Sequence, residues 1–178
     1  MIAPPDAPAS PAPCLTPEAK AIAIVGPSNS GKTGLICGLL KWFATQQIKV
    51  AVLKHSHKNI LGDEGKDTGR FRAAGGGLVA LAAPGLLQIN RACAGEPKLA
   101  AILAELAPEV DLILTEGYKT SDLPKIGVVG PNLPRTLPDY PRLVAWVSPL
   151  ALPTNLPVFH PAQVADLGRF IQARLGSL

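Results

Sequence analysis

The sequence predicts an α/β fold, with a mostly parallel sheet flanked by helices and locally paired strands in the second half of the chain. Short, wholly apolar segments such as 21–25 and 50–53 are typical of strands that are buried on both faces. In the first half these segments alternate with segments of helical pattern, which favours a parallel sheet. Hydrophobic residues make up 47% of the 178 residues and aromatic residues only 4%, so the core must consist mainly of aliphatic side chains, which suits buried strands.

Residues 1–18 are predicted to form a flexible tail that precedes a single nucleotide-binding domain over residues 19–178. Proline and alanine dominate the tail, and this composition favours extended, solvated backbone. The rest of the chain is long enough to bury a core without disulfides or metals, and it contains no internal repeat.

Charge and cysteine content argue against several classes of protein. The net charge is +4, and Lys and Arg are scattered rather than clustered, so we expect no nucleic-acid partner. Cys14, Cys37 and Cys93 are odd in number and widely spaced, which favours free thiols in a reducing cytoplasm. No apolar segment reaches the roughly 18 residues that suggest a membrane span, and the N-terminus lacks the pattern of a secretion signal. A cytoplasmic location without membrane contact is therefore expected.

The most informative segment is Gly26-Pro27-Ser28-Asn29-Ser30-Gly31-Lys32-Thr33, between the first strand and an amphipathic helix that extends to about residue 47. A glycine-rich turn in this context predicts a phosphate-binding P-loop, whose backbone N–H groups and helix N-terminus form a nest for phosphate oxygens. Lys32 would offset the charge of the outer phosphates, and the Thr33 hydroxyl could bind the accompanying Mg²⁺. We therefore expect a P-loop NTPase-type domain that binds a nucleoside diphosphate or triphosphate through Gly26, Ser28, Asn29, Ser30, Gly31, Lys32 and Thr33.

A second strand, over residues 48–53, ends in Lys54-His55-Ser56-His57-Lys58. In a parallel sheet this end lies at the carboxyl edge, beside the P-loop. Lys54, His55 and His57 would then form a charged rim for phosphates or for a substrate anion, although a solvated polar loop explains these residues equally well. A metal site is not expected, because no further ligand lies at a familiar spacing from the two histidines.

A buried strand over residues 111–115 delivers Glu116 to the same edge of the sheet. An acidic residue at the end of a hydrophobic strand is where P-loop proteins place a second contact to Mg²⁺ or to its water. Asp111 opens the strand and would lie at the far edge. We therefore predict that Glu116, rather than Asp111, belongs to the metal site.

Further elements complete the predicted chain. Asp67 or Thr68 can cap a helix over residues 70–74, and Gly75 can end it. Residues 130–142 carry four prolines and must be a loop. Apolar periodicity gives strands over residues 77–82, 86–90, 125–129, 143–148 and 156–159, and helices over residues 98–107 and 161–175.

Five motifs in order resemble the MobB family, the molybdopterin-guanine dinucleotide biosynthesis adaptor proteins. The resemblance extends from about residue 20 to about residue 172. It is carried by the P-loop with Val25, by Val52-Leu53-Lys54-His55-Ser56-His57, by Gly65-Lys66-Asp67-Thr68 with the helix through Arg70 and Arg72 to Gly75, by Leu114-Thr115-Glu116-Gly117-Tyr118-Lys119, and by Pro124-Lys125-Ile126.

The resemblance implies a GTP-binding homodimer related to dethiobiotin synthetase and the nitrogenase iron protein. Such a protein assists the guanylyltransferase MobA, which joins GMP from GTP to the molybdenum-bound pterin, and it hydrolyses GTP only weakly. It also implies roles for residues of this chain. Lys32 and Glu116 would act in hydrolysis, Thr33 and Glu116 would hold Mg²⁺, and a charged surface for the pterin phosphate or the partner would comprise Lys54, His55, His57, Lys66 and Asp67 with the Arg70/Arg72 helix.

Two features of the sequence bear on the nucleotide base. Members of the family often carry an acidic residue just after the strand that here ends at Ser148, but this chain has Pro149. No N-K-x-D or T-K-x-D motif occurs, so guanine preference rests on the resemblance alone.

Two other functions fit a P-loop with an acidic strand end and a basic rim. A small-molecule kinase would need a mobile lid with arginines, whereas the loop 130–142 holds Arg135 and Arg142 but is stiffened by its prolines. A GTPase metallochaperone usually carries a Cys/His cluster, and here only His55 and His57 are available.

Overall fold

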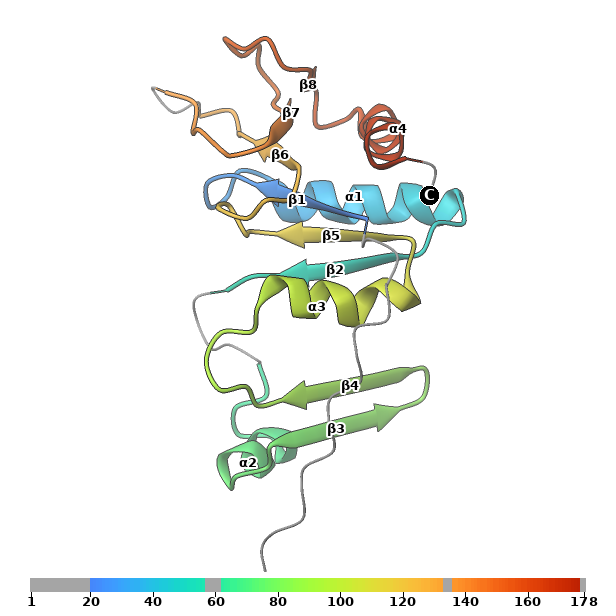
Figure 1. Cartoon of the computed structure of the whole chain (residues 1–178), viewed down its shortest axis with the longest axis vertical. Helices are drawn as coiled ribbons and strands as arrows, with labels where there is room; N and C mark the ends of the chain where they lie inside the picture. The colour runs from blue at the N-terminus through green and yellow to red at the C-terminus, as the bar shows by residue number, and fades with distance from the viewer. Residues whose placement is uncertain (1–19, 57–61, 133–135, 177–178) are drawn as a thin grey trace, which may run out of the picture.

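The computed structural model describes residues 20–56, 62–132 and 136–176. In these residues a six-stranded, wholly parallel sheet has the strand order β2-β5-β1-β6-β7-β8, and a two-stranded antiparallel hairpin, β3-β4, stands apart from it (Figure 1). The α/β prediction is confirmed, and β6, β7 and β8 are consecutive neighbours, which is the predicted local pairing. The elements are β1 (Ala21–Val25), α1 (Lys32–Thr45), β2 (Val50–Lys54), α2 (Asp67–Ala73), β3 (Leu78–Ala83), β4 (Leu86–Arg91), α3 (Leu99–Leu106), the 3₁₀ turn η1 (Ala107–Glu109), β5 (Leu112–Glu116), β6 (Lys125–Val128), β7 (Leu143–Val147), β8 (Val158–Phe159) and α4 (Val164–Leu175).

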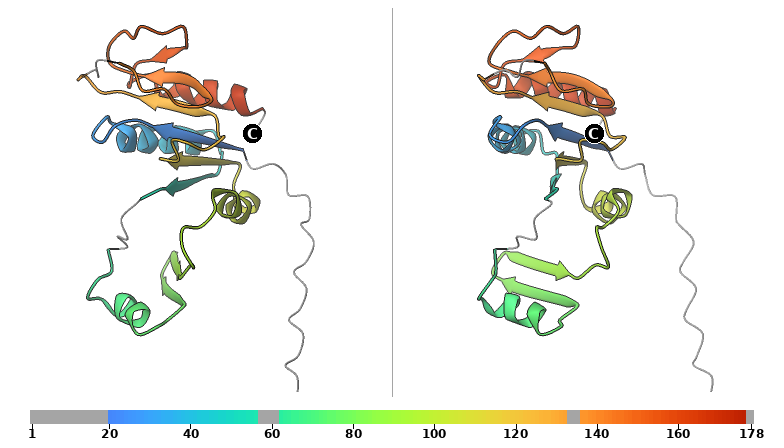
Figure 2. Two further views of the ribbon diagram at one scale, coloured as in Figure 1. Left: turned by 60° about the vertical axis from the view of Figure 1, so that its left-hand side comes forward. Right: turned by 90° about the vertical axis from the view of Figure 1, so that its left-hand side faces the viewer.

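Different helices cover the two faces of the sheet (Figure 2). On one face, Ile22 and Ile24 of β1 pack with Leu39 of α1 and Ile171 of α4 in one buried cluster. Helix α3 lies on the opposite face, as a right-handed crossover from β2 back to its neighbour β5 requires. Strand β1 lies between β5 and β6, and its residues are at most 3% exposed. The P-loop is therefore anchored on a fully buried strand.

Phe43 of α1 is fully buried in the cluster between the sheet and α4. Its replacement by alanine is expected to lower the free energy of unfolding by roughly 3–5 kcal/mol, because the lost ring leaves a cavity that its neighbours only partly fill. Urea denaturation followed by circular dichroism measures this loss. Cys37→Ser, on an exposed position of the same helix, is the control and should change stability by less than about 0.5 kcal/mol. A similar small change for Phe43→Ala would contradict the central place of this ring.

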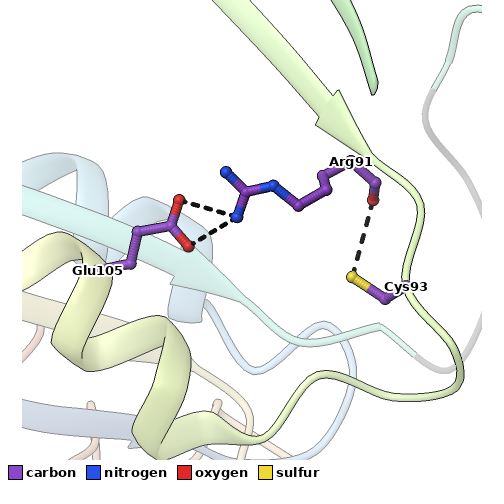
Figure 3. A network of polar contacts seen from close by, with 3 residues as sticks. All are labelled: Arg91, Cys93 and Glu105. Atoms are coloured by element: carbon purple, nitrogen blue, oxygen red, sulfur yellow. Dashed lines mark hydrogen bonds and ion pairs between the residues drawn. The ribbon is translucent and has the colours of Figure 1, made fainter. Parts of the chain in front are cut away.

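Helix α2 and strands β3 and β4 form a unit that we call the hairpin arm, which extends away from the sheet (Figures 1 and 2). Arg91 at the end of β4 forms an ion pair with Glu105 of α3, with 3.2 Å between the guanidinium Nη1 and the carboxylate Oε2 (Figure 3). The Cys93 thiol donates to the Arg91 carbonyl oxygen at 3.8 Å, where the chain leaves β4. These contacts lie at the base of the arm. The predicted single domain over residues 19–178 stays a prediction.

Two predicted helix starts are wrong. Helix α2 begins at Asp67 rather than after it, with Lys66 as the extended cap residue and no capping side chain; Asp67 instead lies 3.8 Å from Arg70 as an ion pair. Helix α4 begins at Val164, because the Gln163 side chain accepts the His160 N–H at 2.7 Å and holds the residues around Pro161 in a turn. The predicted end of α2 at Gly75 is confirmed, with φ at 101°.

Asp111 precedes β5 rather than opening it, and its carboxylate accepts the Lys49 N–H at 2.8 Å. It therefore lies at the edge opposite the P-loop, as predicted. The proposed tail, residues 1–18, lies outside the described residues. In the part of the chain that the structure describes, no helix is long and apolar enough to cross a membrane.

Candidate nucleotide-binding site

The P-loop leaves β1 through two backbone conformations that favour glycine. Gly26 has φ at 157°, and an added Cβ would overlap the carbonyl oxygen of Val128. Gly31 has φ at 95° and forms the cap of α1, where its carbonyl accepts the Leu35 N–H at 3.0 Å. Asn29 also adopts a left-handed conformation, with φ at 60°. The loop thus curls back over the start of α1, the geometry in which backbone N–H groups can face an anion.

Lys32 spans the loop that precedes it. Its Nζ donates to the Pro27 carbonyl oxygen at 2.5 Å. Partial burial lowers the pKa of Lys32, and nearby Lys119 and Lys54 act in the same direction, whereas Glu116 opposes them. The side chain is therefore a cation held beside two others at the mouth of the P-loop, a surrounding that favours bound anions.

Glu116 ends β5, between β1 and β2, and is paired in register with Ile24 and with Lys54. Its carboxylate Oε2 lies 3.4 Å from Lys54 Nζ, and its side chain is only 16% exposed. The position at the carboxyl edge beside Lys32 agrees with the sequence prediction.

Lys119 was not assigned a role from the sequence, although it stands in the same motif as Glu116. The turn that returns it towards Lys32 passes through Gly117 and Tyr118, both with positive φ, at 106° and 53°. A non-glycine residue in this conformation cannot be foreseen from spacing alone. The signal for Lys119 in the sequence is its position three residues after the carboxylate at the end of the strand.

The polar groups around the P-loop suit phosphates and a hard cation. The Ser30 hydroxyl is buried and has no hydrogen-bond partner among the described residues, so a phosphate oxygen could accept from it. Thr33 is exposed in the first turn of α1, with its hydroxyl available to Mg²⁺. The described residues contain no group of three metal-binding side chains. Mg²⁺ does not require one, because nucleotide phosphates and water supply most of its ligands.

The predicted charged rim is divided between two parts of the fold. His55 stacks on Tyr118, with ring centroids 4.6 Å apart, and its Nε2 lies 2.6 Å from the Glu96 carboxylate. It therefore joins the turn after β5 to the segment that returns from the hairpin arm. Lys66 and Asp67 lie at α2 in the arm, away from the P-loop (Figure 1). His57 lies outside the described residues.

Comparison with known proteins identifies the family. The sequence model of MobB, described as molybdopterin guanine dinucleotide synthesis protein B, matches residues 21–149. The chain belongs to the MobB family. A curated relative from Haemophilus influenzae, the molybdopterin-guanine dinucleotide biosynthesis adapter protein, is 33% identical over 153 residues, which cover 85% of this chain and 83% of the relative.

Solved MobB structures share the fold. The crystal structure of a molybdopterin-guanine biosynthesis protein B superposes with a TM-score of 0.69 at 26% identity, covering 87% of this chain and 98% of the other. Bacillus subtilis MobB superposes with a TM-score of 0.70 at 23% identity, covering 89% and 99%. The part matched by the MobB sequence model contains the P-loop, Glu116 and the hairpin arm, and it ends at Pro149.

Proposed function

We propose that this MobB protein is a GTP-binding adaptor with weak GTPase activity that assists guanylylation of the molybdenum-pterin cofactor. The observation that carries the proposal is the convergence of Lys32, Lys54, Lys119 and Glu116 on a P-loop of the correct geometry. The family match and the names of its relatives supply the pathway.

Each residue of the P-loop site has a chemical role in this proposal. The backbone N–H groups of Gly26 to Thr33, with the Ser30 hydroxyl, hold the phosphates, and Lys32 exchanges its contact with the Pro27 carbonyl for a contact with the outer phosphates. Thr33 and Glu116 hold Mg²⁺, which neutralises charge that develops on the phosphates. Because Lys54 engages Glu116, the carboxylate is a poor general base, which fits slow hydrolysis.

The proposed partners are a MobA-type guanylyltransferase and the molybdopterin cofactor. Lys54 and Lys119 extend the positive charge of the site beyond Lys32 and offer contacts to the pterin phosphate. Cys37 and Cys93 are free and exposed, which supports a cytoplasmic location.

The kinase alternative is weakened by the position of Arg142. This residue directly precedes β7, and its carbonyl accepts the Lys125 N–H at the start of β6. It therefore lies at the edge of the sheet opposite the P-loop, where a lid arginine could not reach the γ-phosphate.

We further propose that a second copy of the chain binds to the hairpin arm and forms the homodimer. Leu78, Leu87 and Ile89 lie on one face of the hairpin, where Ile89 pairs with Ala80, Leu87 with Ala82, and Leu78 with Arg91. Their exposure of 55–63% is unusual for neighbouring large aliphatic residues. In the part of the chain that the structure describes, β3 and β4 form a two-stranded sheet, so each strand has one outer edge, and two hairpins related by a two-fold axis can complement one another.

Ile89→Glu is expected to weaken the dimer by about 2 kcal/mol or more, because it places a charge at the centre of the apolar face. Analytical ultracentrifugation over a concentration series measures the dimer dissociation constant. Gln88→Glu adds the same charge to the opposite face of β4 and is the matched control. If Ile89→Glu and Gln88→Glu change the dimer dissociation constant equally, or if neither variant changes it, this interface is contradicted.

Calorimetric titration of the full chain with GTP in the presence of Mg²⁺ tests the proposed function, followed by an assay of its effect on guanylylation by a MobA-type enzyme. Saturable GTP binding and a stimulated yield of guanylylated cofactor are expected. If GTP binds but the yield of guanylylated cofactor does not rise, the protein binds nucleotide and the adaptor role is contradicted.

A further inference from the structure

Lys125 begins β6 as a fully buried cation that has no role in the function proposed above. Its Nζ donates to the carbonyl oxygens of Ser121 and Leu123, the latter at 2.9 Å. Both acceptors belong to residues 117–124, between β5 and β6, which we call the β5–β6 loop. Strand β6 is itself paired with β1 and β7. The ammonium group therefore ties the second half of this loop to the interior of the sheet.

Burial of the Lys125 ammonium group costs free energy. Its two partners are neutral carbonyls rather than a carboxylate, and such contacts offset only part of the cost of leaving water. Burial lowers the pKa of Lys125, while nearby Asp122 opposes this shift. A methionine would fill a similar space without burying a charge. The geometry that Lys125 imposes on the loop therefore explains its presence better than stability does.

Contacts inside the β5–β6 loop connect Lys125 to Lys119. Ser121 donates twice to the Tyr118 carbonyl oxygen, from its N–H at 3.1 Å and from its hydroxyl at 2.9 Å. The first of these bonds closes a turn that has Lys119 and Thr120 at its centre. Lys125 binds the carbonyl of Ser121, which in turn binds the carbonyl of Tyr118. The peptide group that leads into Lys119 is therefore fixed relative to the sheet.

Tyr118 is the residue of the loop that most needs such a constraint. Its φ of 53° is a left-handed conformation, which is unfavourable for a residue with a large side chain. Its ring stacks on His55, which follows β2, with ring centroids 4.6 Å apart. The Gly117 N–H donates to the Ile24 carbonyl oxygen of β1 at 3.2 Å. These contacts hold the first half of the loop beside the P-loop, and Lys125 holds the second half.

Lys119 is exposed in the turn, and its charge helps to lower the pKa of Lys32. Because Lys32 lies over the P-loop, the turn presents a second cation to the outer phosphates of a bound nucleotide, as well as to the pterin phosphate proposed above. A long exposed side chain loses rotamer entropy when it binds a phosphate. The affinity that Lys119 contributes therefore depends on where its backbone is held.

We propose that Lys125 is a positioning residue that holds Lys119 at the phosphate end of the nucleotide site through the β5–β6 loop. The inference deepens the nucleotide-binding function proposed above and rests on it. Lys125 is buried, so its effect on phosphate binding passes through Lys119 rather than through contact with the ligand. A side chain that only stabilised the core would change the free energy of unfolding without this dependence on Lys119.

A double-mutant cycle on the full chain tests this inference, with calorimetric titration of GTP and of inorganic tripolyphosphate in the presence of Mg²⁺. Lys119→Ala is expected to weaken both probes by about tenfold, at the lower end for a charge-assisted contact because Lys119 is exposed. Lys125→Met should weaken them by a similar factor, and the double variant should bind no more weakly than Lys119→Ala. Lys49→Met makes the same chemical change at an exposed position before β2 and should leave both affinities within about twofold.

Thermal denaturation establishes which variants are folded. Losses of affinity that add in the double variant would overturn the inference, because Lys125 would then act independently of Lys119. Affinity like that of the parent in folded Lys125→Met, or in Lys119→Ala, would also overturn it and leave the proposed function intact. If the parent chain binds neither probe, the nucleotide-binding function is contradicted and the inference falls with it.

Ser121→Ala tests the same connection if Lys125→Met does not fold. It removes the hydroxyl contact to the Tyr118 carbonyl and leaves Lys125 in place. Both probes should bind about threefold more weakly, as expected for one hydrogen bond. This loss should disappear when Lys119 is already alanine. Unchanged affinity in Ser121→Ala, or a loss that persists beside Lys119→Ala, would overturn the inference.

Discussion

Lys32→Ala is expected to weaken GTP binding by roughly 100-fold or more, because each charge-assisted contact to a phosphate contributes about 1.5–3 kcal/mol and Lys32 can make more than one. The loss should be large because the side chain is already held over the P-loop, at 2.5 Å from the Pro27 carbonyl. Its ordering entropy is therefore largely lost before the ligand binds. Calorimetric titration with GTP and Mg²⁺ measures the change.

Lys41→Ala is the matched control for Lys32→Ala. Lys41 is exposed and lies on the same 14-residue helix, α1. It should leave GTP affinity within about twofold, because an exposed charge beyond the first helical turn is screened by salt. Thermal denaturation should show that both variants remain folded. If the Lys32→Ala variant is folded and its GTP affinity is unchanged, the assignment of the P-loop as the GTP-binding site is contradicted.

Glu116→Gln is expected to reduce Mg²⁺-dependent GTP hydrolysis by about 10²-fold and to raise the Mg²⁺ concentration needed for half-maximal rate. The change keeps the size of the side chain but removes the charge that faces Lys32 at the end of β5. Phosphate release as a function of Mg²⁺ concentration measures both effects, and calorimetry separates them from GTP binding.

Lys54→Met separates the metal role of Glu116 from its ion pair. It also removes the contact between Lys54 and Glu116, but it leaves the carboxylate in place. If Glu116 acts at the metal, only Glu116→Gln shifts the Mg²⁺ dependence. If both variants lower the rate equally with an unchanged Mg²⁺ dependence, Glu116 serves only to position Lys54.

The sequence predicted the sheet because its strands are short apolar runs, and it predicted Glu116 because strand direction determines which end of β5 faces the P-loop. Contacts between distant segments could not be predicted in this way. The pair between His55 and Glu96 joins residues 41 positions apart, and its formation depends on how the hairpin arm returns to α3. Local turns set a second limit, since Lys119 reaches the site through the positive φ of Tyr118.

The hairpin arm leaves the chain after β2 and returns before α3, so it is an insertion in a β-α-β crossover that is already complete without it. In the described residues, β3 and β4 of this insertion pair with each other and with no strand of the six-stranded sheet. The proposed phosphate site and the proposed dimer interface therefore lie in separate segments of the chain. Substitutions in the insertion would act on the proposed dimer interface, and the geometry around the P-loop need not change with them.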